Sequence, residues 1–120
     1  MGLRQSDVTA TVAINASLSG AVFLGGGSLL VIQMPAAWTA AAITFQSSID
    51  GATYGDVYDS DGIEVAIASA TAAASRVIAF TTQMLAVFAR LQYLKLRSGT
   101  SGAPVTQAAA RSLALGTMPV

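Results

Sequence analysis

The chain has 120 residues, of which 53% are hydrophobic and only 10% are charged, with six basic and six acidic side chains. This length fits one domain around a single core, and the zero net charge gives no attraction to DNA, RNA or an anionic membrane. Because cysteine and histidine are both absent, a disulfide framework, a zinc site built on thiolate or imidazole, and a His-based catalytic triad are excluded.

The first seven residues, MGLRQSD, are too polar for a signal peptide and predict a short N-terminal arm over residues 1–7. From residue 8 to residue 14 apolar side chains alternate with threonine and alanine, which predicts a half-buried strand. Further strands are expected at 21–24 and 29–33, because glycines at 20 and 25–27 mark the breaks.

A membrane span through residues 20–45 has to be weighed, because residues 8–49 carry no charge. Gly25, Gly26, Gly27, Gln33 and Pro35 interrupt this stretch, and β-branched residues flank the interruptions. A transmembrane helix is therefore disfavoured. Trp38, which follows Met34-Pro35-Ala36-Ala37, is interpreted as a core plug rather than a platform for sugar stacking.

Two Asp-Gly pairs, Asp50-Gly51 and Asp61-Gly62, lie eleven residues apart. Asp-Gly favours a hairpin turn, because glycine accepts positive φ and aspartate bonds its own backbone. Apolar and aromatic residues stand on both sides of each pair. The prediction is three antiparallel strands, over residues 43–47, 53–58 and 63–67, joined at these turns.

The segment Asp59-Ser60-Asp61-Gly62 also has the order of residues found inside calcium loops. If Gly62 took the invariant glycine position, however, the first and twelfth ligand positions would fall on Val57 and Ala68, which cannot bind a hard cation. A solvated acidic turn is favoured. An irregular oxygen site built from Asp56, Asp59 and Asp61 remains the alternative.

The second half of the chain predicts a loop with one helical turn over 67–74, strands at 77–81, 91–97 and 112–115, and a C-terminal tail at 117–120. Residues 82–88 fit one short helix with Met84, Leu85 and Phe88 facing inward. Short strands at this density predict a single all-β domain, an antiparallel β-sandwich or jelly roll with about eight short strands.

The segment ITFQSSIDGATYGDVYDSDG, followed by RLQYLKLRSG, resembles the second half of discoidin-type, galactose-binding-like jelly rolls. In that family a strand ending in Ser-x-Asp-Gly leads to an aromatic strand, and a strand of alternating basic and hydrophobic residues follows. The resemblance implies a fold and no ligand-binding residue. The matching positions are Phe45, Ser48, Asp50, Gly51 and Tyr54, then Tyr93, Leu94, Lys95, Leu96 and Arg97.

The segments MPAAWTAAAITFQSSIDG and LRSGTSGAPVTQAAARSLAL resemble small structural proteins of tailed bacteriophages. This resemblance implies a non-enzymatic virion protein, a capsid decoration or cement protein that binds the major capsid protein or other virion proteins, with no cofactor and no metal. Its place would be the virion, assembled in the host cytoplasm. A carbohydrate-binding or structural module of a phage tail, neck, fibre or adhesin is the alternative.

The charges are concentrated in two segments. One alternative is that both are solvated faces of one sheet, paired within the chain. The other is that the acidic hairpin of one subunit meets the basic strand of the next, which would give a homo-oligomer, most simply a trimer. The candidate interface residues are Asp56, Asp59, Asp61 and Glu64 in the acidic segment, and Arg90, Lys95 and Arg97 in the basic one.

Overall fold

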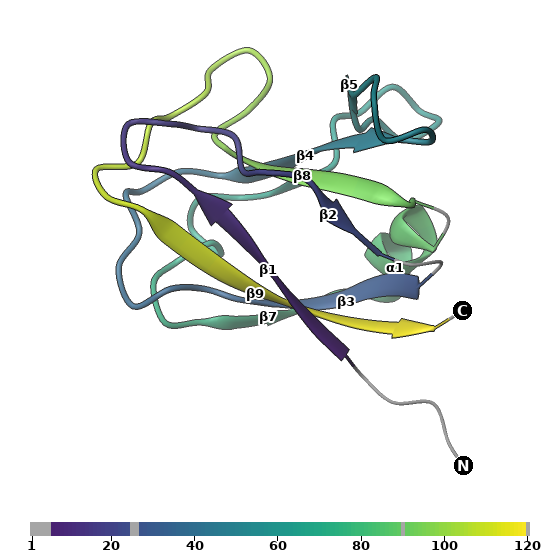
Figure 1. Ribbon diagram of the computed structural model, residues 1–120, viewed down its shortest axis with the longest axis horizontal. Coiled ribbons are helices and arrows are strands. Elements are labelled where there is room, and N and C mark those ends of the chain that lie inside the picture. The colour runs from purple at the N-terminus through teal and green to yellow at the C-terminus, as the bar shows by residue number, and fades with distance from the viewer. Residues whose placement is uncertain (1–5, 25–26, 90, 120) are drawn as a thin grey trace.

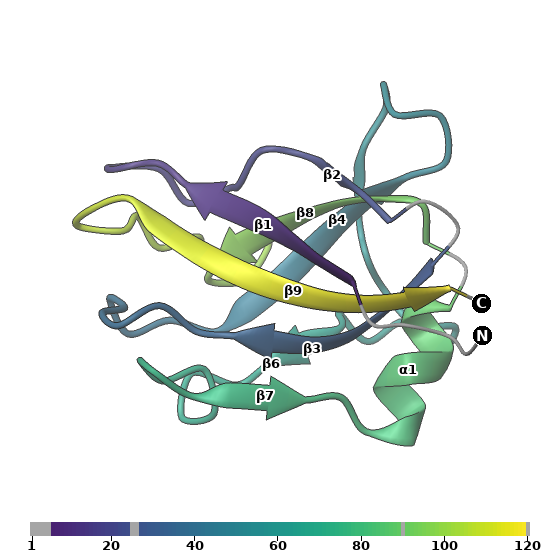
Figure 2. The same ribbon diagram turned by 60° about the horizontal axis from the view of Figure 1, so that its bottom comes forward.

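Two antiparallel sheets lie face to face in the computed structural model, which describes residues 6–24, 27–89 and 91–119 (Figure 1). The four-stranded sheet has the order β1 (Ser6–Val12), β9 (Arg111–Pro119), β3 (Gly27–Gln33) and β7 (Val77–Ala79) (Figure 2). The five-stranded sheet has the order β2 (Val22–Phe23), β8 (Tyr93–Ser98), β4 (Ile43–Ser48) and β5 (Gly55–Asp56), and β6 (Ala66–Ile67) also pairs with β4. The predicted antiparallel β-sandwich is therefore confirmed.

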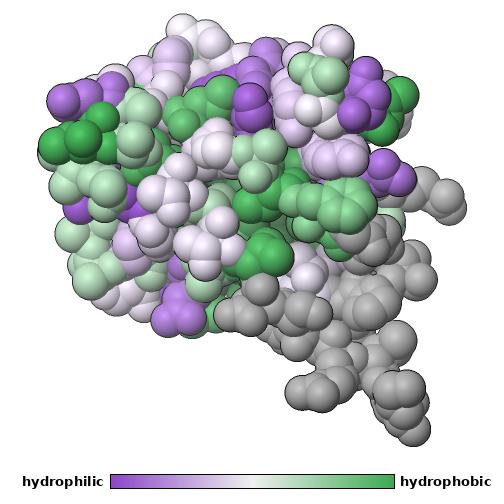
Figure 3. Space-filling view, in the orientation of Figure 1, coloured by the Kyte–Doolittle hydropathy of each residue, from purple (hydrophilic) through white to green (hydrophobic). Residues whose placement is uncertain are grey.

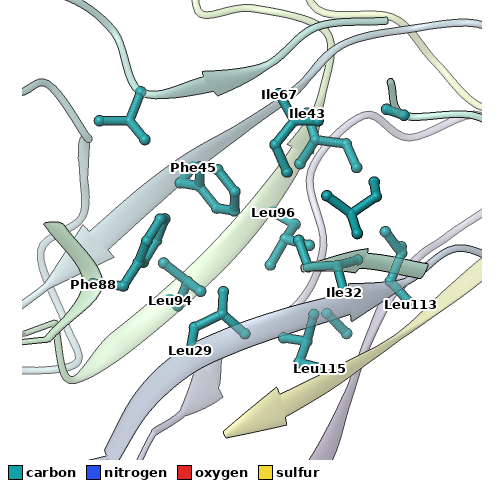
Figure 4. Close-up of a cluster of buried hydrophobic side chains, with 14 of the residues drawn as sticks. Leu29, Ile32, Ile43, Phe45, Ile67, Phe88, Leu94, Leu96, Leu113 and Leu115 are labelled. Carbon is teal, nitrogen blue, oxygen red and sulfur yellow. The ribbon is translucent and has the colours of Figure 1, made fainter. Parts of the chain in front are cut away.

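The core fills the space between the two sheets (Figure 4). Strands bury every second residue because successive side chains point to opposite faces of a sheet. Phe45 and Phe88 meet edge to face, with ring centroids 4.7 Å apart, a geometry that aromatic pairs prefer. The fully buried strand residues of this core include Ile43, Phe45, Leu94, Leu96, Leu113 and Leu115.

Strand β3 departs from simple alternation. Leu29 and Ile32 are both fully buried although they are three positions apart. The register of β3 against β9 shifts between Leu29 and Val31, and a bulge of this kind places one extra residue in the strand. The bulge therefore lets two large aliphatic side chains of opposite parity enter the same core.

The predicted three-stranded meander is only partly correct. Strand β4 forms as predicted, but β5 and β6 pair with the same edge of β4, one after the other, instead of forming successive neighbours in the sheet. Val57 and Ile67 are both buried, and burying both requires the two segments to lie along that edge. The residues between them form a hairpin, joined by a bridge between Tyr58 and Glu64.

Helix α1 (Thr82–Phe88) has the predicted bounds, and the Thr81 hydroxyl accepts a bond from the Met84 amide at its N-cap. Phe88 is buried, and the half-buried Met84 and Val87 pack against the core, whereas Leu85, also half-buried, does not belong to this set. The inward face is therefore shifted from the predicted one, because positions three and four apart share a helix face. In residues 67–74, the amides of Thr71 and Ala72 bond the Ala68 carbonyl, a single helical turn as predicted.

The chain ends form more sheet than the sequence predicts. Strand β1 begins at Ser6 and β9 runs to Pro119, so part of each predicted arm belongs to a strand. Trp38 is half-buried and packs on the margin of the core, where its indole Nε1 donates to the Ala41 carbonyl at 3.2 Å. It therefore supports the core from the side instead of filling its centre.

Candidate functional site

A buried arginine organises the charged residues of the chain. Arg97 lies on β8 between the core residue Leu96 and Ser98, and its side chain, only 8% exposed, points to the outer side of the five-stranded sheet. Its guanidinium forms ion pairs with Asp56 and with Glu64, the latter at 3.3 Å. It also donates to the Thr44 hydroxyl at 3.2 Å. One cation thus joins strand β4 to β5 and to the second strand of the hairpin that follows β5.

The two carboxylates beside Arg97 are held by further bonds. The guanidinium of Arg97, and then the amide of Gln46, lower the pKa of Asp56 below its usual value because both donate to the charged form. Glu64 accepts bonds from the Ser101 amide at 3.2 and 3.3 Å. The side chains of Asp56 and Glu64 remain 34% and 16% exposed, so water still reaches them.

The other predicted interface residues have different roles. Lys95 places its ammonium 4.3 Å from the centre of the Tyr54 ring, a cation–π contact. One carboxylate oxygen of Asp59 accepts the amides of Asp61 and Ile63, at 2.9 and 3.0 Å, and so closes its own turn. Asp61 is exposed.

The structure brings Asp56, Glu64 and Arg97 together inside one chain, which is the intrachain pairing that the sequence left open. Arg90 lies outside the described residues. A contact between the acidic hairpin of one subunit and the basic strand of another stays a prediction.

The Asp-Gly turns owe their shape to aspartate and glycine in different ways. Asp50 accepts bonds from the amides of Thr53 and Ala52 and from the Ser48 hydroxyl, and these bonds lower its pKa to about 2. Gly51 has a φ of 78°, and a side chain there would meet the ring of Tyr93 at 3.1 Å. A glycine at 51 thus allows the loop to lie on that ring.

Several aromatic rings of the five-stranded sheet contact other side chains. Tyr93 lies against Gly51 on one side and against the ring of Phe23 at 4.9 Å between centroids, and Lys95 covers a face of Tyr54. Phe23 and Tyr58 are the exposed rings, at 56% and 51%, and Tyr58 lies beside an open hollow of about 440 Å³. That hollow separates the hairpin from helix α1 and is also lined by Asp59, Asp61, Gln83 and Val87.

A buried glutamine at the opposite end of the sandwich could not be recognised from the sequence. The Gln107 amide group donates to the Thr39 carbonyl and the Ser98 hydroxyl, and accepts from the Thr39 amide and from Arg111. These bonds satisfy the buried side chain and tie the loop of Gln107 to the loop of Thr39 and to strands β8 and β9. Gln107 lies in a run of alanines with no pattern that marks it.

The outer face of the four-stranded sheet has a different chemistry. Among the strand residues whose side chains the structure describes, those that face outward carry no charge. A shallow groove of about 500 Å³ crosses this face over β3, β7 and β9, and Val77 at its edge is 61% exposed. The outward residues are Thr9, Thr11, Val31, Gln33, Val77, Ala79, Ser112, Ala114 and Gly116.

Metal-binding clusters and membrane-spanning helices are both absent from the described ranges. No group of three or more acidic side chains in the described ranges could hold a metal ion. None of the helices in those ranges is long and apolar enough to cross a membrane. No protein family model, curated protein or solved structure matches the chain.

Proposed function

We propose that the protein is a non-enzymatic structural component of a tailed-phage virion, a decoration or cement protein that adheres to the head shell. One observation carries this proposal, namely the difference between the two sides of the sandwich. The five-stranded sheet has its ions paired on its outer side, whereas the outward strand residues described on the four-stranded sheet are uncharged. The second side is the adhesive face in this proposal.

Adhesion through a face whose described outward side chains carry no charge has a simple physical basis. Small side chains such as Thr9, Ala79 and Ala114 allow close approach, and burial of apolar atoms supplies the free energy. Figure 3 views the sandwich from the side of β1 and β2 and not onto this outer face, and the side that it shows has green and pale residues over its middle. A protein with this composition suits an assembly in which part of its surface is covered.

The extent of the face sets the expected strength of a single contact. Four strands spaced about 4.8 Å apart and about 20 Å long give a face on the order of 400 Å². A standard interface takes about 800 Å² from each partner. One copy would therefore bind a shell weakly, and occupancy would depend on several copies acting together.

Copy counting by mass spectrometry on purified virions of the phage that encodes the chain tests the function. Hundreds of copies per particle would support a head decoration, a few to tens would indicate a tail, neck or fibre component, and an absence of the chain would refute the virion proposal.

A matched pair of variants tests the face. Ala79→Lys places a charge on the uncharged side and should abolish cosedimentation with undecorated shells. Ser60→Lys, on the exposed hairpin, should cosediment like the parent. Equal binding by both variants would show that this face is not the adhesive one.

A glycan-binding module of a tail or adhesin is the second candidate, and one feature favours it. Tyr58 stands beside a hollow that also presents Asp59, Asp61 and Gln83, and an aromatic ring with nearby hydrogen-bonding groups can hold a sugar. Binding on a glycan array that Tyr58→Ala removes and Tyr54→Ala retains would favour this candidate over the decoration protein.

A further inference from the structure

Strand β1 has one long edge that the described residues leave largely unpaired. On its inner side β1 pairs with β9 along its whole length, from Ser6 opposite Thr117 to Val12 opposite Arg111. On its outer side the described residues supply one backbone bond, from the Gly20 amide to the Thr11 carbonyl at 3.3 Å. Figure 2 shows β1 at the margin of its sheet.

The Thr11 bond reveals which backbone groups face outward. In an antiparallel strand the N–H and C=O groups of alternate residues point to the same side. Residues 7 and 9 therefore share the outward direction of Thr11. Their amides and carbonyls are the groups at this edge for which the described chain offers no partner.

The edge carries little of the usual protection against strand pairing. Proteins guard edge strands with charges, proline, bulges or short length. Asp7 is the one charged residue of β1, Val8 to Val12 contain neither charge nor proline, and the pairing with β9 runs without a register shift. The other edges are short, since β7 has three residues and β2, β5 and β6 have two each.

We propose that β1 is a dimerisation strand, which pairs antiparallel with β1 of a second copy about a two-fold axis at Val8. In this register residue 7 of each copy lies opposite Thr9 of the other, and each such pair exchanges two backbone bonds. The bond between Gly20 and Thr11 stays intact. In this register the outward-facing amides and carbonyls of residues 7 and 9 all find hydrogen-bond partners.

A second copy is the occupant that this geometry and charge favour. A two-fold pairing covers both exposed edges at once and leaves none for further growth. The chain has no net charge, so copies do not repel at long range.

The pairing also keeps the two faces of the sheet in order. It pairs odd-numbered residues with odd-numbered ones and even-numbered residues with even-numbered ones. Side chains that face the core in one copy therefore lie on the same side of the joined sheet as those that face the core in the other. The two outer faces would become one continuous face on the order of 800 Å², with Asp7 of each copy at the seam. This inference concerns the purified protein and does not depend on the proposed function.

Two proline variants test the proposal by sedimentation equilibrium. Proline removes an N–H and places its ring on that side of the strand. At Thr9 and Thr11 the N–H points away from β9, so neither variant loses a bond within the sheet. Thr9→Pro should raise the dimer dissociation constant on the order of 100-fold or more, because it removes bonds central to the pairing. Thr11→Pro, outside the paired residues, should dimerise like the parent.

Hydrogen exchange on the parent protein gives a test that requires no variant. The amides of residues 7 and 9 should become more protected as protein concentration rises, whereas the amide of Thr11 should not. A parent chain that remains monomeric at about 0.5 mM would overturn the proposal. So would an oligomer that Thr9→Pro leaves unchanged, such as a head-to-tail trimer that Lys95→Glu disrupts.

Discussion

Replacing Arg97 by methionine should lower the free energy of unfolding by about 2–4 kcal/mol. Breaking a buried ion pair by removing one partner usually costs about 3–5 kcal/mol, because the other charge is left without compensation. The cost is smaller here because the side chains of Asp56 and Glu64 are 34% and 16% exposed and can regain water. Thr44 does not lose its last partner, since its hydroxyl still donates to the Gly99 carbonyl at 2.7 Å.

Urea unfolding followed by tryptophan fluorescence measures this loss, and thermal unfolding should show a decrease of about 3–6 °C per kcal/mol for a chain of this size. Lys95→Met is the matched control, because Lys95 lies on the same face of β8 but makes only the cation–π contact with Tyr54. It should cost less than about 1 kcal/mol.

Neutralising the partners provides a second check on the same reasoning. Adding Asp56→Asn and Glu64→Gln to Arg97→Met removes the uncompensated charges and should recover at least about half of the lost stability. A change of less than about 0.5 kcal/mol in Arg97→Met alone would refute a stabilising role for the intrachain ion pairs.

Three further predictions concern the turns. The bonds that its carboxylate accepts lower the pKa of Asp50 to about 2, so Asp50 binds a proton at a higher pH in the unfolded chain than in the folded one. Its contribution to the free energy of unfolding is complete above about pH 4 and should be lost as the pH falls towards 2. Acid titration of the unfolding free energy should show a shallower decline in Asp50→Asn. Gly99 has a φ of 93°, and a Cβ there would lie 2.5 Å from the Ala103 carbonyl oxygen. Gly99→Ala should therefore lower the free energy of unfolding, measured by chemical denaturation, by more than about 3 kcal/mol. An equally stable variant would contradict this geometry. Because the acidic turn lacks the ligands of a calcium loop, adding calcium or EDTA should leave the melting temperature of the parent protein unchanged. The same should hold for the double variant Asp59→Asn, Asp61→Asn. A calcium-dependent rise in the melting temperature of the parent would disprove the turn interpretation.

The candidate site was only partly predictable. The sequence shows that acidic residues gather at 50–64 and basic residues at 90–97, and both intrachain and interchain pairing are compatible with that distribution. Arg97 pairs within the chain because β8 lies next to β4, with Thr44 opposite Arg97, and β5 adds Asp56 on the other edge of β4. No local signal marks a basic strand residue as buried, because burial depends on the hairpin that covers it.

Local physics was enough to predict the strands with two-residue periodicity, the helix at 82–88 and the all-β sandwich, since alternation, turn residues and composition act over a few positions. Long-range pairing decided the rest. Strands β5 and β6 share one edge of β4. The bulge that brings Leu29 and Ile32 into the same core arises where β3 pairs with β9, and Gln107 bonds the loops of Ala16 and Thr39. Each of these contacts joins segments distant in sequence. Such contacts form only when the two sheets close on each other, because the apolar area that stabilises them does not exist in any single segment.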